Sequence, residues 1–319
     1  MSSVPTKTRS AAKKSFLALA AIAFSLNVAK AESRTVETAL GPVTIEGQPE
    51  RVVTLYEGAL DTTLAVGSSA VGAVITRGGS DVADYIQPQA ADVAIVGAPA
   101  ETNIEAVIAA RPDLILAAPR TSKQQYQLLS RVAPVVVSDV PMFQPDSWKQ
   151  ETQLFARALG QEEAGEAVIE QVESRIAEVR QLVEATIPED RRDATLVRWM
   201  PQGPLVMAEG LFSASILQAT GFEVTDNNLV KDGRPHSEPL SLENLARMDQ
   251  SWVVLATLNE DGEKALESAR KSPAFERLNA VRNEQVISVS GQLWTSASGP
   301  LAALAILDDI ETAVQNIQP

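Results

Sequence analysis

Apolar residues follow strand-like and helix-like spacings in turn, on both sides of one long helical segment. Ahead of that segment, short β-branched runs predict strands at residues 51–55, 71–75, 93–96, 114–117 and 135–137, after a hairpin of 35–39 and 43–45. Beyond it, strands are predicted at 195–200, 204–208, 252–256 and 286–289. Helical spacing covers 59–66, 124–133, 213–219 and 301–317. Alternating strands and helices favour an α/β fold with two Rossmann-like lobes, each built on a mostly parallel sheet.

The long helical segment predicts a stiff connection between these lobes. Residues 162–185 contain no Gly or Pro after Gly165, and Pro188 follows them. Apolar side chains recur with helical spacing at Val168, Val172, Ile176, Val179 and Val183. A one-faced helix of about 22 residues would be roughly 33 Å long. We therefore expect an N-terminal lobe over 32–160, a connecting helix over 161–187 and a C-terminal lobe over 188–319.

An internal sequence repeat, called the echo below, supports two similar lobes. Residues 104–116 align without gaps with residues 242–254. Each segment predicts a short helix with an acid at its second position, Glu105 or Glu243, followed by a turn and a buried strand. Many helix-turn-strand units share this pattern, but here the two copies lie on opposite sides of the long helix.

The first 31 residues have the pattern of a signal peptide. Basic residues precede an apolar stretch at 16–28, and Ala29 and Ala31 form a small-residue cleavage pattern. The chain contains no cysteine, so it lacks the residue that carries the lipid of an exported lipoprotein. We therefore expect an untethered protein in the periplasm.

Composition narrows the possible ligands. The formal net charge is −14, and five of the 27 basic residues lie within the first 31 positions, so the remainder is more acidic still. Such a surface repels nucleic acid and anionic lipid. His236 is the single histidine, and with no Cys a direct transition-metal site is not expected. We expect no resident cofactor.

Arginines and aromatic residues follow the predicted strands. In open α/β sheets, ligands bind beyond the carboxyl ends of the strands, so two facing lobes would place these residues around a cleft. Arg guanidinium groups match carboxylates, and aromatic rings supply rigid apolar walls. The sequence thus predicts a site for an anionic, partly planar ligand, with these candidates: Tyr56, Arg77, Arg120, Arg198, Trp199, Arg234 and Trp294. Each arginine taken singly is better explained as a solvated surface residue, so the prediction rests on the set and not on any one member.

Motifs for catalysis are missing from the chain. Neither a Gly-x-Ser-x-Gly, a His-Glu-x-x-His nor a phosphate-binding Gly-x-x-x-x-Gly-Lys sequence occurs. Ser/His/Asp catalysis would have to use His236, whose neighbours form no recognised catalytic context. We therefore expect a binding protein; an enzyme on this scaffold would lose turnover when His236 is changed.

Several motifs resemble those of periplasmic iron-siderophore-binding proteins. Residues 49–67 with 71–74 are similar to the opening of that family, and 103–115 (NIEAVIAARPDLI) to its most recognisable internal motif. Residues 240–245 and 278–286 are similar to its second-lobe pattern. The similarity covers nearly the whole chain beyond the first 31 residues.

The resemblance implies a monomeric, two-lobed protein that carries a ferric siderophore or ferric citrate to an inner-membrane ABC permease. The chelator would coordinate the iron, and arginines would complement its charge. Glu105 and Glu243 match the acids with which the family meets its permease, although both positions also suit the first turn of a helix. Haem or cobalamin remains an alternative ligand, with Tyr56 and His236 as candidate axial ligands for haem.

Overall fold

The computed structural model describes residues 1–3, 33–141 and 143–317, and Glu32–Pro319 forms one compact unit. The predicted signal peptide lies outside the described residues, apart from residues 1–3. Among the described residues, no helix combines the length and the apolar character needed to cross a bilayer.

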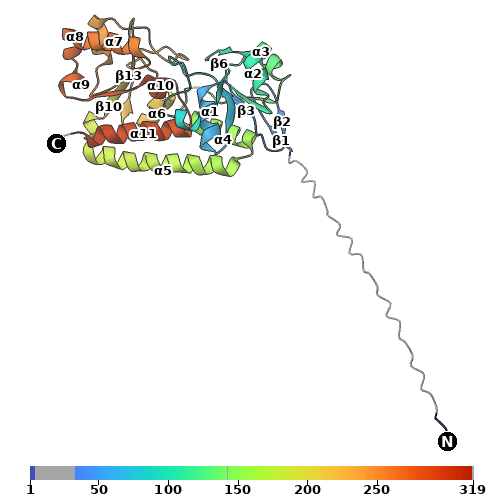
Figure 1. Cartoon of the computed structure of the whole chain (residues 1–319). Coiled ribbons are helices and arrows are strands. Elements are labelled where there is room, and N and C mark those ends of the chain that lie inside the picture. Colours follow the sequence, from blue (N-terminus) through green and yellow to red (C-terminus); the bar gives the residue numbers. More distant parts are fainter. Residues whose placement is uncertain (4–32, 142, 318–319) are drawn as a thin grey trace. The chain divides into compact units, whose positions relative to one another are not determined.

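Two sheets carry the fold, one on each side of the long helix in the sequence (Figure 1). The strands are β1 (Ser33–Val36), β2 (Val43–Glu46), β3 (Val52–Thr54), β4 (Ala70–Ala73), β5 (Ala94–Ile95), β6 (Gly97–Ala98), β7 (Glu101–Thr102), β8 (Leu114–Ala117), β9 (Val135–Val137), β10 (Asp193–Met200), β11 (Gly203–Val206), β12 (Glu223–Val224), β13 (Trp252–Thr257) and β14 (Val286–Ser290).

Helices pack around the two sheets. They are α1 (Glu57–Ala65), α2 (Ile104–Ala110), α3 (Lys123–Leu129), α4 (Ser147–Leu159), α5 (Glu162–Thr186), α6 (Phe212–Ala219), α7 (Glu260–Arg270), α8 (Pro273–Glu276), α9 (Asn279–Arg282), α10 (Gly291–Thr295) and α11 (Pro300–Gln315), with 3₁₀ helices η1 (Gln87–Gln89), η2 (Glu189–Arg191) and η3 (Leu242–Met248).

Four strands of each sheet share one order. The N-terminal lobe has the parallel order β5-β4-β3-β8-β9. In the C-terminal lobe, β12, β10, β13 and β14 repeat the parallel order of β4, β3, β8 and β9. The echoed segments end in β8 and β13, which occupy equivalent places. This confirms the predicted α/β fold with two Rossmann-like lobes.

The predicted elements agree with the structure except in local details. β11 pairs antiparallel with β10, because the two residues between them suffice for a hairpin and not for a crossover. The second copy of the echo, η3, is wound as a 3₁₀ helix rather than an α-helix. α3 ends at Leu129, four residues before the predicted end. The sequence analysis left the helices α4, α7, α8 and α9 unpredicted.

The long helix α5 packs against both lobes. Toward its start, Gly165 lies so close to α4 that an added Cβ would lie 2.5 Å from the Ala156 Cβ. Further along, Val172, Val179 and Val183 enter the core of the C-terminal lobe. α11 runs beside α5 (Figure 1). The predicted stiff connection is therefore held by packing at both ends.

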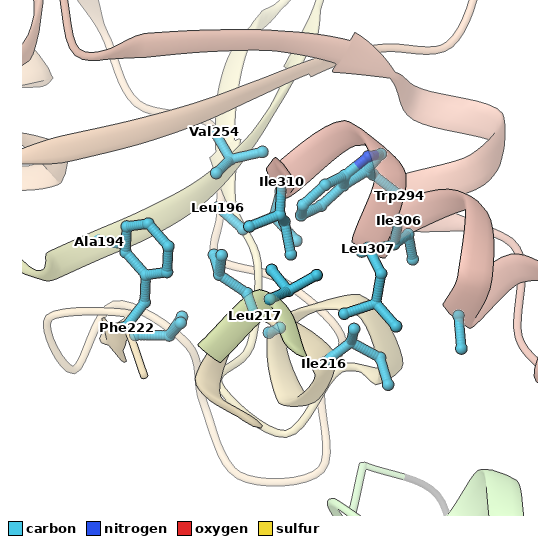
Figure 2. Packing of buried hydrophobic residues seen from close by; sticks show 14 of the residues in the cluster. Ala194, Leu196, Ile216, Leu217, Phe222, Val254, Trp294, Ile306, Leu307 and Ile310 are labelled. Carbon is cyan, nitrogen blue, oxygen red and sulfur yellow. The ribbon is translucent and has the colours of Figure 1, made fainter. Parts of the chain in front are cut away.

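The C-terminal core lies between β10, β13 and the helices α6 and α11. Leu196 and Val254 extend from the strands toward Leu217 of α6 and Ile306 and Ile310 of α11, as Figure 2 shows. All five side chains are buried. Burial of one such side chain stabilises the folded state by about 1.5–3 kcal/mol. This layer therefore holds in place the C-terminal sheet, whose strand ends carry polar side chains.

Candidate functional site

A cavity of about 750 Å³ lies where the strand ends of the two lobes face each other. From the N-terminal lobe it is lined by segments after β3, β4, β8 and β9 and by α4. From the C-terminal lobe it is lined by β10, by the residues after β11 and by the stretch ahead of α11. The lining includes Tyr56, Glu57, Arg77, Arg120, Phe143, Trp148, Glu151, Arg198, Phe212, His236 and Ser298. The cavity therefore lies beyond the carboxyl ends of the strands, the place where ligands bind in open α/β sheets.

Arg198 is a buried charge in this cavity. It lies on β10, only 8% of the residue is exposed, and its Nε has no hydrogen-bond partner among the described residues. Burial lowers the pKa of Arg198 to about 10, and the nearby charge of Arg77 adds to the effect. A largely buried guanidinium whose Nε has no hydrogen-bond partner among the described residues is costly, so this geometry favours an anion at that place.

Arg77 and Arg120 bring two further guanidinium groups to the cavity from the N-terminal lobe. Both residues are exposed, and neither belongs to an ion pair among the described residues. Arg77 follows β4 and Arg120 follows β8, two neighbours of β3. These three arginines from two lobes, none of them in an ion pair within the described part of the chain, give the cavity a positive side despite the acidic surface of the protein.

Two carboxyl groups lie on the wall formed by α1 and α4. Glu57 accepts hydrogen bonds from the Thr76 hydroxyl and, at 3.1 Å, from the Arg77 backbone N–H. Burial raises the pKa of Glu57 above its usual value, although the two hydrogen bonds act in the opposite direction. Glu151 accepts a hydrogen bond from the Tyr56 hydroxyl, and burial raises the pKa of Glu151 to about 8. The Glu151 carboxyl is therefore mostly protonated at neutral pH.

A buried carboxylate behind the cavity joins the two lobes. Asp61 of α1 accepts hydrogen bonds from the backbone N–H groups of Leu301 and Ala302, at 2.9 and 2.8 Å, in the first turn of α11. The Tyr85 hydroxyl donates to the same carboxylate at 2.8 Å. Asp61 has no exposed surface, and burial raises its pKa to about 7. These bonds tie α1 to the stretch just after Ser298, which lines the cavity.

The structure does not bring Trp199, Trp294 or Arg234 to the cavity. Trp199 follows Arg198 on β10, and successive side chains of a strand face opposite sides, so Trp199 packs in the core with its ring 5.9 Å from that of Phe275. Its exposed fraction is 2%.

Trp294 lies in α10, which begins directly after β14 in place of the loop expected there. It is buried, and its Nε1 donates to Asp309 at 2.7 Å. Arg234 is exposed and pairs with Glu238 at 3.0 Å. The cavity therefore receives Tyr56, Arg77, Arg120 and Arg198 from the predicted set.

Glu151, Phe143, Trp148 and Phe212 line the cavity and were missed by sequence reasoning. Trp148 and Glu151 share one face of α4, and the buried residues Trp148, Thr152, Phe155 and Leu159 show the helical spacing that could have revealed this helix. His236 also lines the cavity, with its Nδ1 2.8 Å from the Ser237 carbonyl oxygen. A carbonyl accepts only, so Nδ1 carries the proton.

Glu105 and Glu243 are exposed and lie away from the cavity lining. Glu105 is in the first turn of α2, whose first residues are capped by the Asn103 side chain. Glu243 is in η3 and accepts a hydrogen bond from the Ser241 hydroxyl at 3.0 Å.

Within residues 33–141 and 143–317, no group of three or more His, Cys, Asp or Glu side chains could hold a metal ion. The positive side of the cavity is suited instead to a preformed anionic ligand.

Comparison with known proteins places this architecture among binding proteins. A family model described as periplasmic binding protein matches residues 52–293. The probable siderophore-binding lipoprotein YfiY of Bacillus subtilis is 28% identical over 295 residues, covering 89% of each chain. The achromobactin-binding periplasmic protein of Dickeya dadantii is 26% identical, covering 82% of this chain and 85% of its own.

Solved structures show the same fold. The crystal structure of Staphylococcus aureus SirA complexed with staphyloferrin B matches with a TM-score of 0.75 and 26% identity. The match covers 88% of this chain and 98% of that one.

Proposed function

Because this chain belongs to the periplasmic binding protein family, we propose that it captures a ferric siderophore or ferric-citrate-type chelate in the cavity and delivers it to an ABC permease. The family consists of binding proteins, and the relatives named above carry siderophore names. In this role the iron arrives already coordinated by its chelator, so the protein needs neither a metal site nor a resident cofactor of its own.

The observation that carries the proposal is the buried Arg198, whose Nε has no hydrogen-bond partner in the part of the chain that the structure describes, in a cavity of ligand size. Pockets for small ligands are about 300–1,000 Å³, and this one falls within that range. Arg77 and Arg120 enlarge the positive field around Arg198. An anionic ferric chelate would replace the solvation that Arg198 has lost.

Delivery requires a second surface, for which we propose Glu105 and Glu243. They occupy equivalent positions of the two echoed segments, one in each lobe, and both are exposed. Two carboxylates displayed in this way would pair with basic groups of a permease. Changing both to Ala should abolish iron uptake in cells and leave chelate binding unchanged. If uptake survives at the wild-type rate, the docking assignment fails.

We further propose that the protein acts as a periplasmic monomer after removal of residues 1–31. Its lobes would span 32–160 and 188–319, joined by the helix-containing segment 161–187. The basic, apolar and small-residue pattern of the first 31 positions supports export. Cell fractionation with N-terminal sequencing of the recovered protein tests both the location and the cleavage site.

Direct binding measurements test the main proposal. Trp148 lines the cavity, so an iron chelate bound there should quench tryptophan fluorescence. Titration with ferric citrate, a ferric catecholate and a ferric hydroxamate should give saturable quenching with at least one of them. Failure of all three would overturn the proposal, and a Soret shift on addition of haem would favour haem as the ligand.

A further inference from the structure

The Glu57 side chain is bonded to the turn that carries Arg77 into the cavity, residues 76–79. We propose that Glu57 is a positioning residue for the ligand: its Oε1 atom holds this turn in place and thereby fixes the backbone from which the Arg77 guanidinium extends. This role rests on the proposed function, because it matters only if a chelate binds in the cavity.

One oxygen atom of Glu57 accepts two hydrogen bonds from the turn. The Thr76 hydroxyl donates one of them, and the Arg77 backbone N–H donates the other at 3.1 Å. Glu57 is the first residue of α1, which follows β3, whereas the turn follows β4, the neighbour of β3 in the sheet. Thr76 is buried, so its hydroxyl needs an acceptor within the protein. The Oε1 atom therefore joins two segments that leave adjacent strands.

The turn itself is tight and lies against the C-terminal lobe. The Gly79 backbone N–H donates to the Thr76 carbonyl oxygen at 3.2 Å. Gly78 has a φ of +80°, and a Cβ added there would lie 3.0 Å from the Cβ of Leu258, which directly follows β13. The C-terminal lobe therefore limits the movement of the turn in one direction, and the two bonds to Glu57 hold it from within its own lobe.

The arrangement leaves the Arg77 guanidinium available to a ligand. In the part of the chain that the structure describes, no ion pair joins this guanidinium to Glu57 or to another carboxylate. Burial raises the pKa of Glu57 despite the two hydrogen bonds and the charge of Arg77, so the charged form is disfavoured. A carboxyl oxygen accepts hydrogen bonds in either protonation state, so the bonds to the turn do not depend on that charge.

A role of the Glu57 charge is the competing explanation. Glu57 lies in the first turn of α1, where a negative charge stabilises the helix, and a carboxylate also attracts the guanidinium of Arg77. Aspartate would serve both charge roles, but its shorter side chain withdraws the carboxyl group from the turn. Glutamine has no charge and keeps an accepting oxygen at the Oε1 position. These two substitutions therefore separate position from charge.

Affinity measurements on Glu57 variants test the positioning role. The wild type is titrated with ferric citrate, ferric enterobactin and ferrioxamine by calorimetry, and the chelate that it binds most tightly is then used for Glu57→Gln, Glu57→Asp and Glu57→Ala. We expect the Gln variant to stay within about threefold of the wild type. The Asp and Ala variants should each lose at least about tenfold, equal to about 1.4 kcal/mol, because a turn that must be ordered on binding lowers the affinity.

The outcomes separate this role from the proposed function. An affinity of the Asp variant equal to or above that of the Gln variant refutes the positioning role and leaves the proposed function intact. A wild type that binds none of the three chelates refutes the proposed function, and the positioning role with it.

A second series shows whether Glu57 acts through Arg77. Glu57→Ala is measured alone and in the background of Arg77→Gln, which lacks the guanidinium. Because effects of residues that act on one another are not additive, we expect Glu57→Ala to lower the affinity by less than about threefold in that background, against at least about tenfold alone. Equal losses in the two backgrounds would mean that Glu57 supports the fold in general, which refutes the positioning role.

Glu46→Asp and Glu46→Ala are the matched controls. Glu46 is exposed at the end of β2 and lies outside the cavity lining. These variants make the same chemical changes in the same lobe, and they should change the affinity by less than about twofold, because an exposed charge away from the cavity is largely screened. Urea denaturation of every variant establishes that it is folded at the temperature of the titration. Losses at Glu46 as large as those at Glu57 refute the positioning role.

Discussion

The effect of burying the Asp61 carboxyl group can be measured as a change in the free energy of unfolding with pH. It lies fully buried on α1 and accepts hydrogen bonds from Leu301, Ala302 and Tyr85. Replacing it with Asn keeps the size of the side chain and one carbonyl acceptor, and removes the ionisation. Comparing Asp61→Asn with the wild type therefore isolates the proton that Asp61 binds.

The magnitude follows from the pKa. Burial raises the pKa of Asp61 from 3.8 to about 7, so the folded state binds more protons than the unfolded state between these values. The stabilising contribution is fully present below pH 3.8 and is lost as the pH rises through about 7. A shift of about three pKa units corresponds to about 4 kcal/mol in total, of which about 3 kcal/mol falls between pH 5 and pH 8.

Urea denaturation at several pH values measures this directly. Unfolding of the wild type and of Asp61→Asn is followed by circular dichroism, and the free energy of unfolding of the variant is subtracted from that of the wild type at each pH. Contributions of Glu57 and Glu151 cancel in this difference. We expect it to fall by about 3 kcal/mol from pH 5 to pH 8.

A difference that stays constant within about 1 kcal/mol over this range would refute the reasoning, because Asp61 would then ionise alike in both states. Asp61→Ala is the control for the lost hydrogen bonds. It leaves two backbone donors of α11 unpaired, which costs about 1–3 kcal/mol for each donor at every pH.

Two further predictions concern the same wall of the cavity. Burial raises the pKa of Glu151 to about 8, so the affinity for an anionic chelate should fall as the pH rises through that value; Glu151→Gln should flatten the profile measured by fluorescence titration, and an unchanged profile would exclude Glu151 as its source. Gly299 has a φ of +114°, and an added Cβ would collide with the Asp61 carboxylate. Gly299→Ala should therefore lower the free energy of unfolding by about 2–4 kcal/mol. The control is Gly41→Ala, because Gly41 has a φ of +107° but open space around it, and here we expect a loss of about 1–2 kcal/mol. Equal losses in the two variants would show that the collision at Gly299 is relieved.

Local pattern was sufficient to predict most of the secondary structure. β8 and β9 have the predicted bounds, and α5 begins at the predicted residue and ends one residue later than predicted. A short β-branched run that is buried on both faces has few alternatives to a strand. A long segment with apolar residues on one face and no Gly or Pro after its first turn has few alternatives to a helix. The helix α4 shows the same kind of pattern and could have been found in the same way.

Which side chains meet at the cavity was decided by tertiary structure. Arg198 and Trp199 are neighbours in the sequence, and only the placement of β10 between its neighbouring strands determines that the arginine faces the cavity and the tryptophan the core. Glu151 comes to Tyr56 because α4 packs against α1, and Asp61 meets α11 across 240 residues of sequence. The sequence determined the elements and the two-lobe order, since these depend on local spacing. The burial of charges and their partners depends on contacts between distant segments, which no local pattern contains.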